Sequence, residues 1–276
     1  METPMSRKLL TLSLTATLMG GTAFADAPRV AVDIAPVHSL VTRVMEGVGT
    51  PDLIIQAGAS PHEYSLRPSE AAALQDANLV FWIGSGLTPW LTDTIETLAP
   101  NANVTELLEA DGTIELEFRE GALFEAHDDH EEDEHRDDDD HKEDDDDHAN
   151  EEAGHDEHEH GDHDPHAWLS PQNAMTWMNV IAGQLSAADP DNAGAYFANA
   201  AAGRAEIKVL IGEVTATLDP VRDGRFIVFH DAYQYFETDF NFPASGAISI
   251  SDASDPSPAR IAEIQDRIAE QGIDCV

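Results

Sequence analysis

Cysteine is nearly missing from this chain of 276 residues, in which Cys275 is the single one. One cysteine cannot form a disulfide within the chain, and it rules out a metal site built from several thiolates. Basic side chains are also scarce: 14 Lys and Arg stand against 54 Asp and Glu, giving a formal net charge of −40. Because nucleic acids and anionic membranes are bound by clustered Lys and Arg, this balance argues against both as partners. A chain this acidic instead concentrates cations around itself.

Long apolar runs are missing as well. The stretch Leu9–Leu18 has about ten residues, whereas a membrane-spanning helix needs roughly 20, so we expect no membrane insertion. This stretch follows the basic pair Arg7 and Lys8 and precedes an Ala-Phe-Ala sequence at 23–25. That order is typical of a secretory signal peptide with its cleavage site. We therefore predict that residues 1–25 are a signal peptide and that the mature protein is exported.

Short apolar runs alternate with helical patterns along most of the remaining chain. The runs that predict strands lie at Val30–Ile34, Leu53–Ile55, Leu79–Ile83, Val104–Leu107, Arg225–Phe229 and Ala247–Ile250. Helical patterns cover 40–45, 69–74 with Ser69 as its cap, 89–98, a stretch from Pro171 capped by Ser170, 192–218, 232–239 and 257–271. This alternation predicts an α/β fold with parallel sheets and helices on both faces. Ligands in such folds bind in the loops at the carboxyl ends of the strands.

One segment differs in composition from everything around it. Residues 127–164 hold 22 Asp and Glu, two basic residues and no Leu, Ile, Val, Phe, Tyr or Trp, and thus carry half of the net negative charge. Since they cannot bury enough apolar surface to offset the entropy of ordering, we predict a disordered insertion. Its nine histidines are His127, His130, His135, His141, His148, His155, His158, His160 and His163. We interpret them as a weak collector of borderline metal ions, the alternative being an inert solvated spacer.

Three of the four other histidines lie at the strand ends where ligands are expected. His62 is in the loop after the second strand, His166 lies just before the helix that starts at Pro171, and His230 directly follows Phe229. A single histidine at a strand end is more often a hydrogen-bonding residue than a ligand. Three imidazoles from three loops, however, can converge on one ion between two lobes. Imidazole nitrogen suits tetrahedral Zn²⁺, and a site without an oxygen cage disfavours calcium, magnesium and manganese.

The three histidines stand in the motifs GASPHEYSLRPS at 58–69, DPHAWLSP at 164–171 and FHDAY at 229–233. Together with the signal peptide and the His/acid-rich segment, these motifs resemble the zinc-binding periplasmic component of zinc ABC importers, within the family of metal-binding solute receptors. The resemblance runs from the signal peptide to residue 276. It implies capture of Zn²⁺ in the periplasm and its delivery to an inner-membrane ABC permease, without enzymatic activity.

The resemblance also implies an architecture of two βα lobes joined by one long rigid helix, with the metal between the lobes. The N-terminal lobe then covers 26–190, the linking helix 191–220 and the C-terminal lobe 221–276. The family's three histidine ligands fall on His62, His166 and His230, and histidine at the last position favours zinc over manganese. Pro61 stands where some zinc members have glutamate, so the fourth ligand is water or a group not identified here. We expect a monomer.

The C-terminal lobe is predicted to be incomplete. A helix marked by Ile261, Ile264 and Ile268 ends near Gly272, and residues 273–276 start what reads as another strand. The single cysteine supports the same prediction, because a disulfide partner in an oxidising compartment would lie beyond the last residue.

Two alternative functions are compatible with the same residues. A periplasmic zinc buffer or chaperone without a permease partner would need the same ligands. A zinc hydrolase would need a general base beside a metal-bound water, for which Glu63 and Asp231 are the nearby candidates, and the His-Glu-x-x-His motif fails because position 66 is Leu66. We interpret His38, at a helix start, as a structural residue or as one that supports a ligand.

Overall fold

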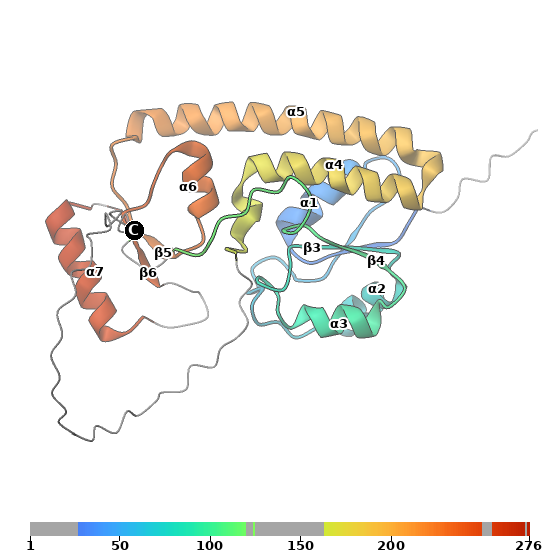
Figure 1. Cartoon of the computed structure of the whole chain (residues 1–276), viewed down its shortest axis with the longest axis horizontal. Coiled ribbons are helices and arrows are strands. Elements are labelled where there is room, and N and C mark those ends of the chain that lie inside the picture. The colour runs from blue at the N-terminus through green and yellow to red at the C-terminus, as the bar shows by residue number, and fades with distance from the viewer. Residues whose placement is uncertain (1–26, 120–123, 125–162, 250–255, 274) are drawn as a thin grey trace, which may run out of the picture.

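The structure is a computed structural model that describes residues 27–119, 124, 163–249, 256–273 and 275–276. The predicted signal peptide and residues 127–162 of the predicted insertion lie outside the described residues. Within the described part, the chain forms two groups of strands and helices connected by a long helix (Figure 1). No helix of this part is both long and apolar enough to cross a membrane.

The N-terminal lobe is a four-stranded sheet in which every pairing is parallel and the strand order is β2-β1-β3-β4. Its strands are β1 (Val30–Val32), β2 (Asp52–Leu53), β3 (Leu79–Trp82) and β4 (Asn103–Glu106), and its helices are α1 (Ala35–Val44), α2 (Pro68–Asp76) and α3 (Leu91–Leu98). Every residue of β1 and β3 is buried, as expected for strands covered on both faces. Because all four strands run the same way, their carboxyl ends lie at one edge of the sheet.

The C-terminal lobe is also built on parallel pairing. Its elements are β5 (Val228–His230), α6 (Gln234–Phe240), β6 (Ala247–Ser249) and α7 (Pro258–Gln271). β5 pairs in parallel with β6 on one side, and Phe226 forms an isolated parallel bridge to Cys275 on the other. α7 begins at the cap Ser257 and ends at Gly272, whose φ of 63° is the left-handed conformation that glycine adopts most easily.

Two long helices follow the N-terminal sheet, and the second of them, α5, connects the lobes. α4 (Pro171–Ala188) starts as predicted, with the Ser170 side chain accepting a hydrogen bond from the Asn173 N–H. α5 (Ala193–Leu218) has 26 residues and is therefore about 39 Å long. It packs along α4 and α1, and its C-terminal end reaches the C-terminal lobe (Figure 1). The predicted α/β fold of two lobes with parallel sheets and a long linking helix is thus confirmed.

The structure differs from the local predictions at several element bounds, and three differences concern the histidine motifs. β5 extends to His230 and does not stop at Phe229, because His230 pairs with Ser249 of the parallel neighbour. α2 begins at Pro68, whose fixed φ suits the first helical position, so that Ser69 lies inside the helix and is not its cap.

The third difference concerns the end of the predicted disordered insertion. His163 forms an antiparallel bridge with Glu117, and the Asp164 N–H donates to the Leu116 carbonyl at 2.8 Å. Asp164 is 2 % exposed. The prediction is therefore wrong for these two residues, because backbone pairing to 116–117 gives the chain an ordered position at the start of the second motif.

Asp33 joins the carboxyl ends of β1 and β3, at the edge of the sheet where ligands are expected to bind. It is 1 % exposed, and its two oxygens accept hydrogen bonds from the Ile34 and Ile83 N–H groups, each at 2.7 Å. Burial raises the pKa of this carboxyl to about 7, in spite of the two backbone donors. The folded state thus holds a proton that the unfolded chain releases once the pH exceeds 3.8, the ordinary pKa of an aspartate side chain.

The difference between the pKa of Asp33 in the folded protein and in the unfolded chain predicts how the free energy of unfolding changes with pH. Between about pH 4 and pH 7 the Asp33 contribution to the free energy of unfolding should decrease by at most about 1.4 kcal/mol per pH unit. An Asp33→Asn variant should be less stable than the parent by roughly 1–3 kcal/mol at pH 4, because one backbone donor loses its acceptor. The gap should narrow as the pH rises. Urea denaturation of both proteins from pH 4 to 8 measures the gap, and a widening gap would contradict the prediction.

Candidate metal site

The three predicted histidines line one cavity between the lobes. This cavity has a volume of about 310 Å³. The ring centroids of His62 and His166 are 6.2 Å apart, and those of His166 and His230 are 5.5 Å apart. The rest of the lining comes from the loops after β1, β2 and β3, the turn before α4 and the residues after β5, including Pro36, Gln56, Leu87, Trp168 and Tyr233.

His62 lies in the loop after β2, which neighbouring aromatic residues support. The Trp90 indole N–H donates to the Pro61 carbonyl at 2.8 Å, directly before the histidine. The Tyr64 ring packs against Trp90 with centroids 5.9 Å apart, and its hydroxyl donates to Glu70 Oε1 at 2.9 Å. The residues on both sides of His62 are therefore fixed to α2 and to the loop before α3.

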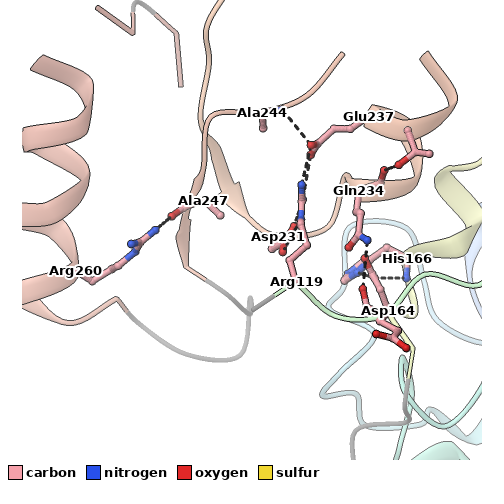
Figure 2. A network of polar contacts seen from close by, with 11 residues as sticks. Arg119, Asp164, His166, Asp231, Gln234, Glu237, Ala244, Ala247 and Arg260 are labelled. Carbon is pink, nitrogen blue, oxygen red and sulfur yellow. Dashed lines mark hydrogen bonds and ion pairs between the residues drawn. The ribbon is translucent and has the colours of Figure 1, made fainter. Parts of the chain in front are cut away.

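His166 is the best anchored of the three imidazoles. It begins a short 3-10 helix, His166–Leu169, and is itself buried. Asp164 Oδ1 accepts hydrogen bonds from the His166 N–H at 2.9 Å and from its Nδ1 at 2.7 Å (Figure 2). Because a carboxylate only accepts, Nδ1 carries the proton and Nε2 presents its lone pair. This carboxylate–histidine arrangement orients many metal ligands in proteins.

His230 comes from the other lobe, at the end of β5. The next residue, Asp231, accepts hydrogen bonds from the Arg119 guanidinium of the N-terminal lobe (Figure 2). Burial, the largest influence, raises the pKa of Asp231, and the nearby Asp164 and Glu237 raise it further while Arg119 opposes them. The Tyr235 hydroxyl also connects the lobes, since it donates to the Asp164 carbonyl at 2.8 Å.

The distances between the rings can be compared with those of a metal complex. Three imidazoles bound tetrahedrally to one Zn²⁺ place their ring centroids about 5 Å apart. Both measured separations are slightly longer. Accordingly, the described residues contain no group of three His, Cys, Asp or Glu side chains that could hold an ion in their present positions. The rings of His62 and His166 would have to approach each other by about 1 Å to reach the spacing of a zinc complex.

Comparison with known proteins places this chain in a family. The family model described as "ZnuA: Zinc-uptake complex component A periplasmic" matches residues 30–276. The chain belongs to the ZnuA family. Among curated members, the proteins named "High-affinity zinc uptake system protein ZnuA" of Brucella abortus and Paracoccus denitrificans are both 45 % identical over 260 residues. These matches cover 93 % and 92 % of this chain and 78 % and 76 % of the respective relatives.

Solved ZnuA structures have the same fold. A crystal structure of ZnuA has a TM-score of 0.67 and 25 % identity to this chain, and the match covers 89 % of this chain and 79 % of that one. A zinc-bound ZnuA deletion mutant has a TM-score of 0.66 and 25 % identity, with 90 % and 79 % covered. The family is one of zinc-binding solute receptors of ABC-type uptake systems and is not an enzyme class.

The carboxylates considered for a hydrolase do not reach the cavity of this ZnuA family member. Glu63 is exposed, and the Asp231 carboxylate binds Arg119. No Asp or Glu of the described chain is among the residues that line the cavity. His38 also lies elsewhere, with Nε2 3.1 Å from the Pro51 carbonyl oxygen, which agrees with a structural role.

Two supporting residues escaped prediction. Asp164 could have been suspected from its place two residues before His166, at the start of the second motif, DPHAWLSP. Arg119 gives no local signal, because its partners Asp231 and Glu237 are 112 and 118 residues further along the chain.

Proposed function

We propose that this chain captures Zn²⁺ in the periplasm through His62, His166 and His230 and delivers it to an inner-membrane ABC permease for uptake. The observation that supports the ligand set most strongly is the convergence of the three rings, from two lobes, on one cavity. The names of the relatives, high-affinity zinc uptake system proteins, support zinc as the cargo and uptake as its purpose.

The proposed site has an open fourth coordination position. Three imidazoles leave room for a water molecule or for a ligand not identified here, and no carboxylate of the described lining competes for the position. An open position suits a carrier, because a closed structural site of four protein ligands would release its ion slowly. Release would then follow when the permease separates the lobes.

The remaining assignments belong to the same proposal. Residues 1–25 act as an export signal, 26–190 and 221–276 form the lobes, and 191–220 link them. The protein works as a monomer, binds no nucleic acid and performs no catalysis. The nine histidines of 127–164 collect zinc weakly for the tight site, because their number and the surrounding acidic residues favour binding of several cations.

Deletion of residues 127–163 tests whether this segment forms only the weak zinc sites and the cavity between the lobes forms the tight one. Calorimetric titration with zinc should show that the deletion removes the weak sites and leaves one tight site. His166→Ala in the full chain should give the reverse result, with the tight site lost and the weak sites kept. Loss of tight binding on deletion would contradict the proposal, since the ligands would then lie in the deleted segment.

A periplasmic zinc buffer is the second candidate, because it would use the same ligands. Growth under zinc limitation separates the two. If the protein delivers zinc to the permease, its gene should restore growth of a strain that lacks it only when the permease is present. Equal restoration in a permease-deleted strain would favour the buffer.

A further inference from the structure

We propose that Arg119 is a positioning residue of the metal site, which holds the His230 segment of the C-terminal lobe at the correct distance from the two N-terminal histidines. This inference rests on the proposed zinc capture, because it assigns a role at the same site. Arg119 acts through Asp231, the residue directly after His230.

The Arg119 guanidinium binds two carboxylates at once (Figure 2). Its Nε donates to Asp231 Oδ2 at 3.1 Å, and its Nη2 donates to Asp231 Oδ1. Its Nη1 donates to Glu237 Oε2 at 2.8 Å, and Nη2 also reaches Glu237 Oε1 at 3.1 Å. Both pairs are therefore bidentate, a geometry that fixes the orientation of a carboxylate as well as its position.

The three side chains are largely removed from water. The exposed fractions are 19 % for the Arg119 side chain, 8 % for Asp231 and 5 % for Glu237. Two buried carboxylates share one cation, so loss of the guanidinium would leave two like charges without compensation. The segment that carries Asp231 would then have to move toward water, and His230 would move with it.

The Glu237 carboxylate holds the Arg119 guanidinium in a fixed position. Glu237 lies within α6, and its Oε2 accepts a further hydrogen bond from the Ala244 N–H at 3.0 Å. Glu237 thus anchors the guanidinium, and the guanidinium in turn presents two donors to Asp231. The face of the guanidinium lies 3.5 Å from the centroid of the Phe124 ring, which packs against Val228, Ala244 and Ala247 of the C-terminal lobe. The backbone just before Arg119 is paired with residues 163–164 beside the His166 motif. The side chain of Arg119 thus binds one lobe while its backbone is tied to the other, as a spacer between them requires.

The Tyr235 contact provides a separate connection between the lobes. Its hydroxyl accepts from the Leu116 N–H at 2.9 Å and donates to the Asp164 carbonyl. It fixes α6 against the strand segment before Arg119 and against the His166 motif, but it does not touch the residue beside His230. Loss of Arg119 should therefore release the His230 segment while the lobes stay together, which makes an effect on the metal site separable from one on folding.

Zinc affinity and the visible spectrum of the Co²⁺ form test this role in the full chain. Arg119→Met keeps most of the side-chain volume and should weaken tight zinc binding about 10–100-fold, the usual loss when a supporting partner of a ligand is removed. It should also change the d–d bands of bound Co²⁺, which report the ligand geometry. Asp231→Asn should give the same changes, and Arg119→Lys, which cannot form both bidentate pairs, an intermediate loss.

The matched control is Arg43→Met. Arg43 also binds two carboxylates, Glu46 and Glu206, but it joins α1 to α5 away from the cavity. This variant should keep the parental zinc affinity and Co²⁺ spectrum. Thermal melting of every variant gives the temperature range in which the folded proteins can be compared.

Three outcomes are decisive. Weaker binding and an altered spectrum in folded Arg119→Met and Asp231→Asn support the inference. Parental affinity and spectrum in these variants, with only a lower melting temperature, overturn it and leave the proposed zinc capture intact. Failure of the unaltered chain to bind zinc overturns the proposed function and the inference together, because there would be no site to position.

Discussion

Tight zinc binding should weaken by more than about 100-fold when any one of His62, His166 and His230 is replaced by alanine. Removing a residue that only supports a ligand typically costs 10–100-fold in metal affinity, so removing a ligand itself should cost more. The triple variant should have no tight site. Calorimetric titration in the background that lacks residues 127–163 is the appropriate measurement, because the nine additional histidines would otherwise add heat of their own.

His38→Ala is the control for these substitutions. His38 lies in the N-terminal lobe, as His62 and His166 do. Its imidazole contacts the Pro51 carbonyl and does not line the cavity. The zinc affinity of the variant should equal that of the parent. One tightly bound zinc per chain in the triple variant would show that the ligands lie elsewhere.

The largest loss of stability is expected from Trp177→Ala in α4. The Trp177 side chain is fully buried in the core of the N-terminal lobe, and its indole N–H donates to Thr113 Oγ1 at 2.9 Å. Truncating a buried tryptophan to alanine costs about 3–5 kcal/mol, because contacts are lost and a cavity remains. The free energy of unfolding from urea denaturation should fall by this amount.

This substitution also tests whether folding and zinc binding are coupled. α4 starts directly after the His166 turn, and Asn173 in its first turn donates to the Ala167 carbonyl at 3.2 Å. Saturating zinc should therefore restore part of the lost stability of the folded protein. Trp177→Phe, which keeps an aromatic ring in the core, should lose less. A Trp177→Ala protein as stable as its parent would contradict the packing described for this helix.

The parallel sheets and the meeting of the three histidines at one cavity could be predicted from the sequence for physical reasons. Buried parallel strands give continuous apolar runs such as that at 79–83, and strand–helix alternation places all carboxyl ends at one edge. Because ligands bind at this edge, the rule predicts that His62, His166 and His230 lie near one another there. The cap Ser170 was also predictable, because capping depends on residues adjacent in sequence.

The supporting contacts were not predictable in the same way. Arg119 meets Asp231 and Glu237 only because the two lobes pack together, and neither spacing nor composition marks a pair more than 100 residues apart. The extent of β5 depended on its neighbour: His230 joins the strand because it pairs with Ser249. The ordered position of Asp164 likewise follows from its backbone hydrogen bond to Leu116, which the acidic composition around it conceals.

Anomalous diffraction at the zinc absorption edge, from crystals of the zinc-loaded protein, tests the ligand set most directly. We expect one strong peak in the cavity between the lobes, about 2.0–2.1 Å from one ring nitrogen of each of His62, His166 and His230. For His166 that nitrogen should be Nε2, since Nδ1 is bound to Asp164. A strong peak outside this cavity, or one bound to fewer than three of these rings, would contradict the proposed zinc site.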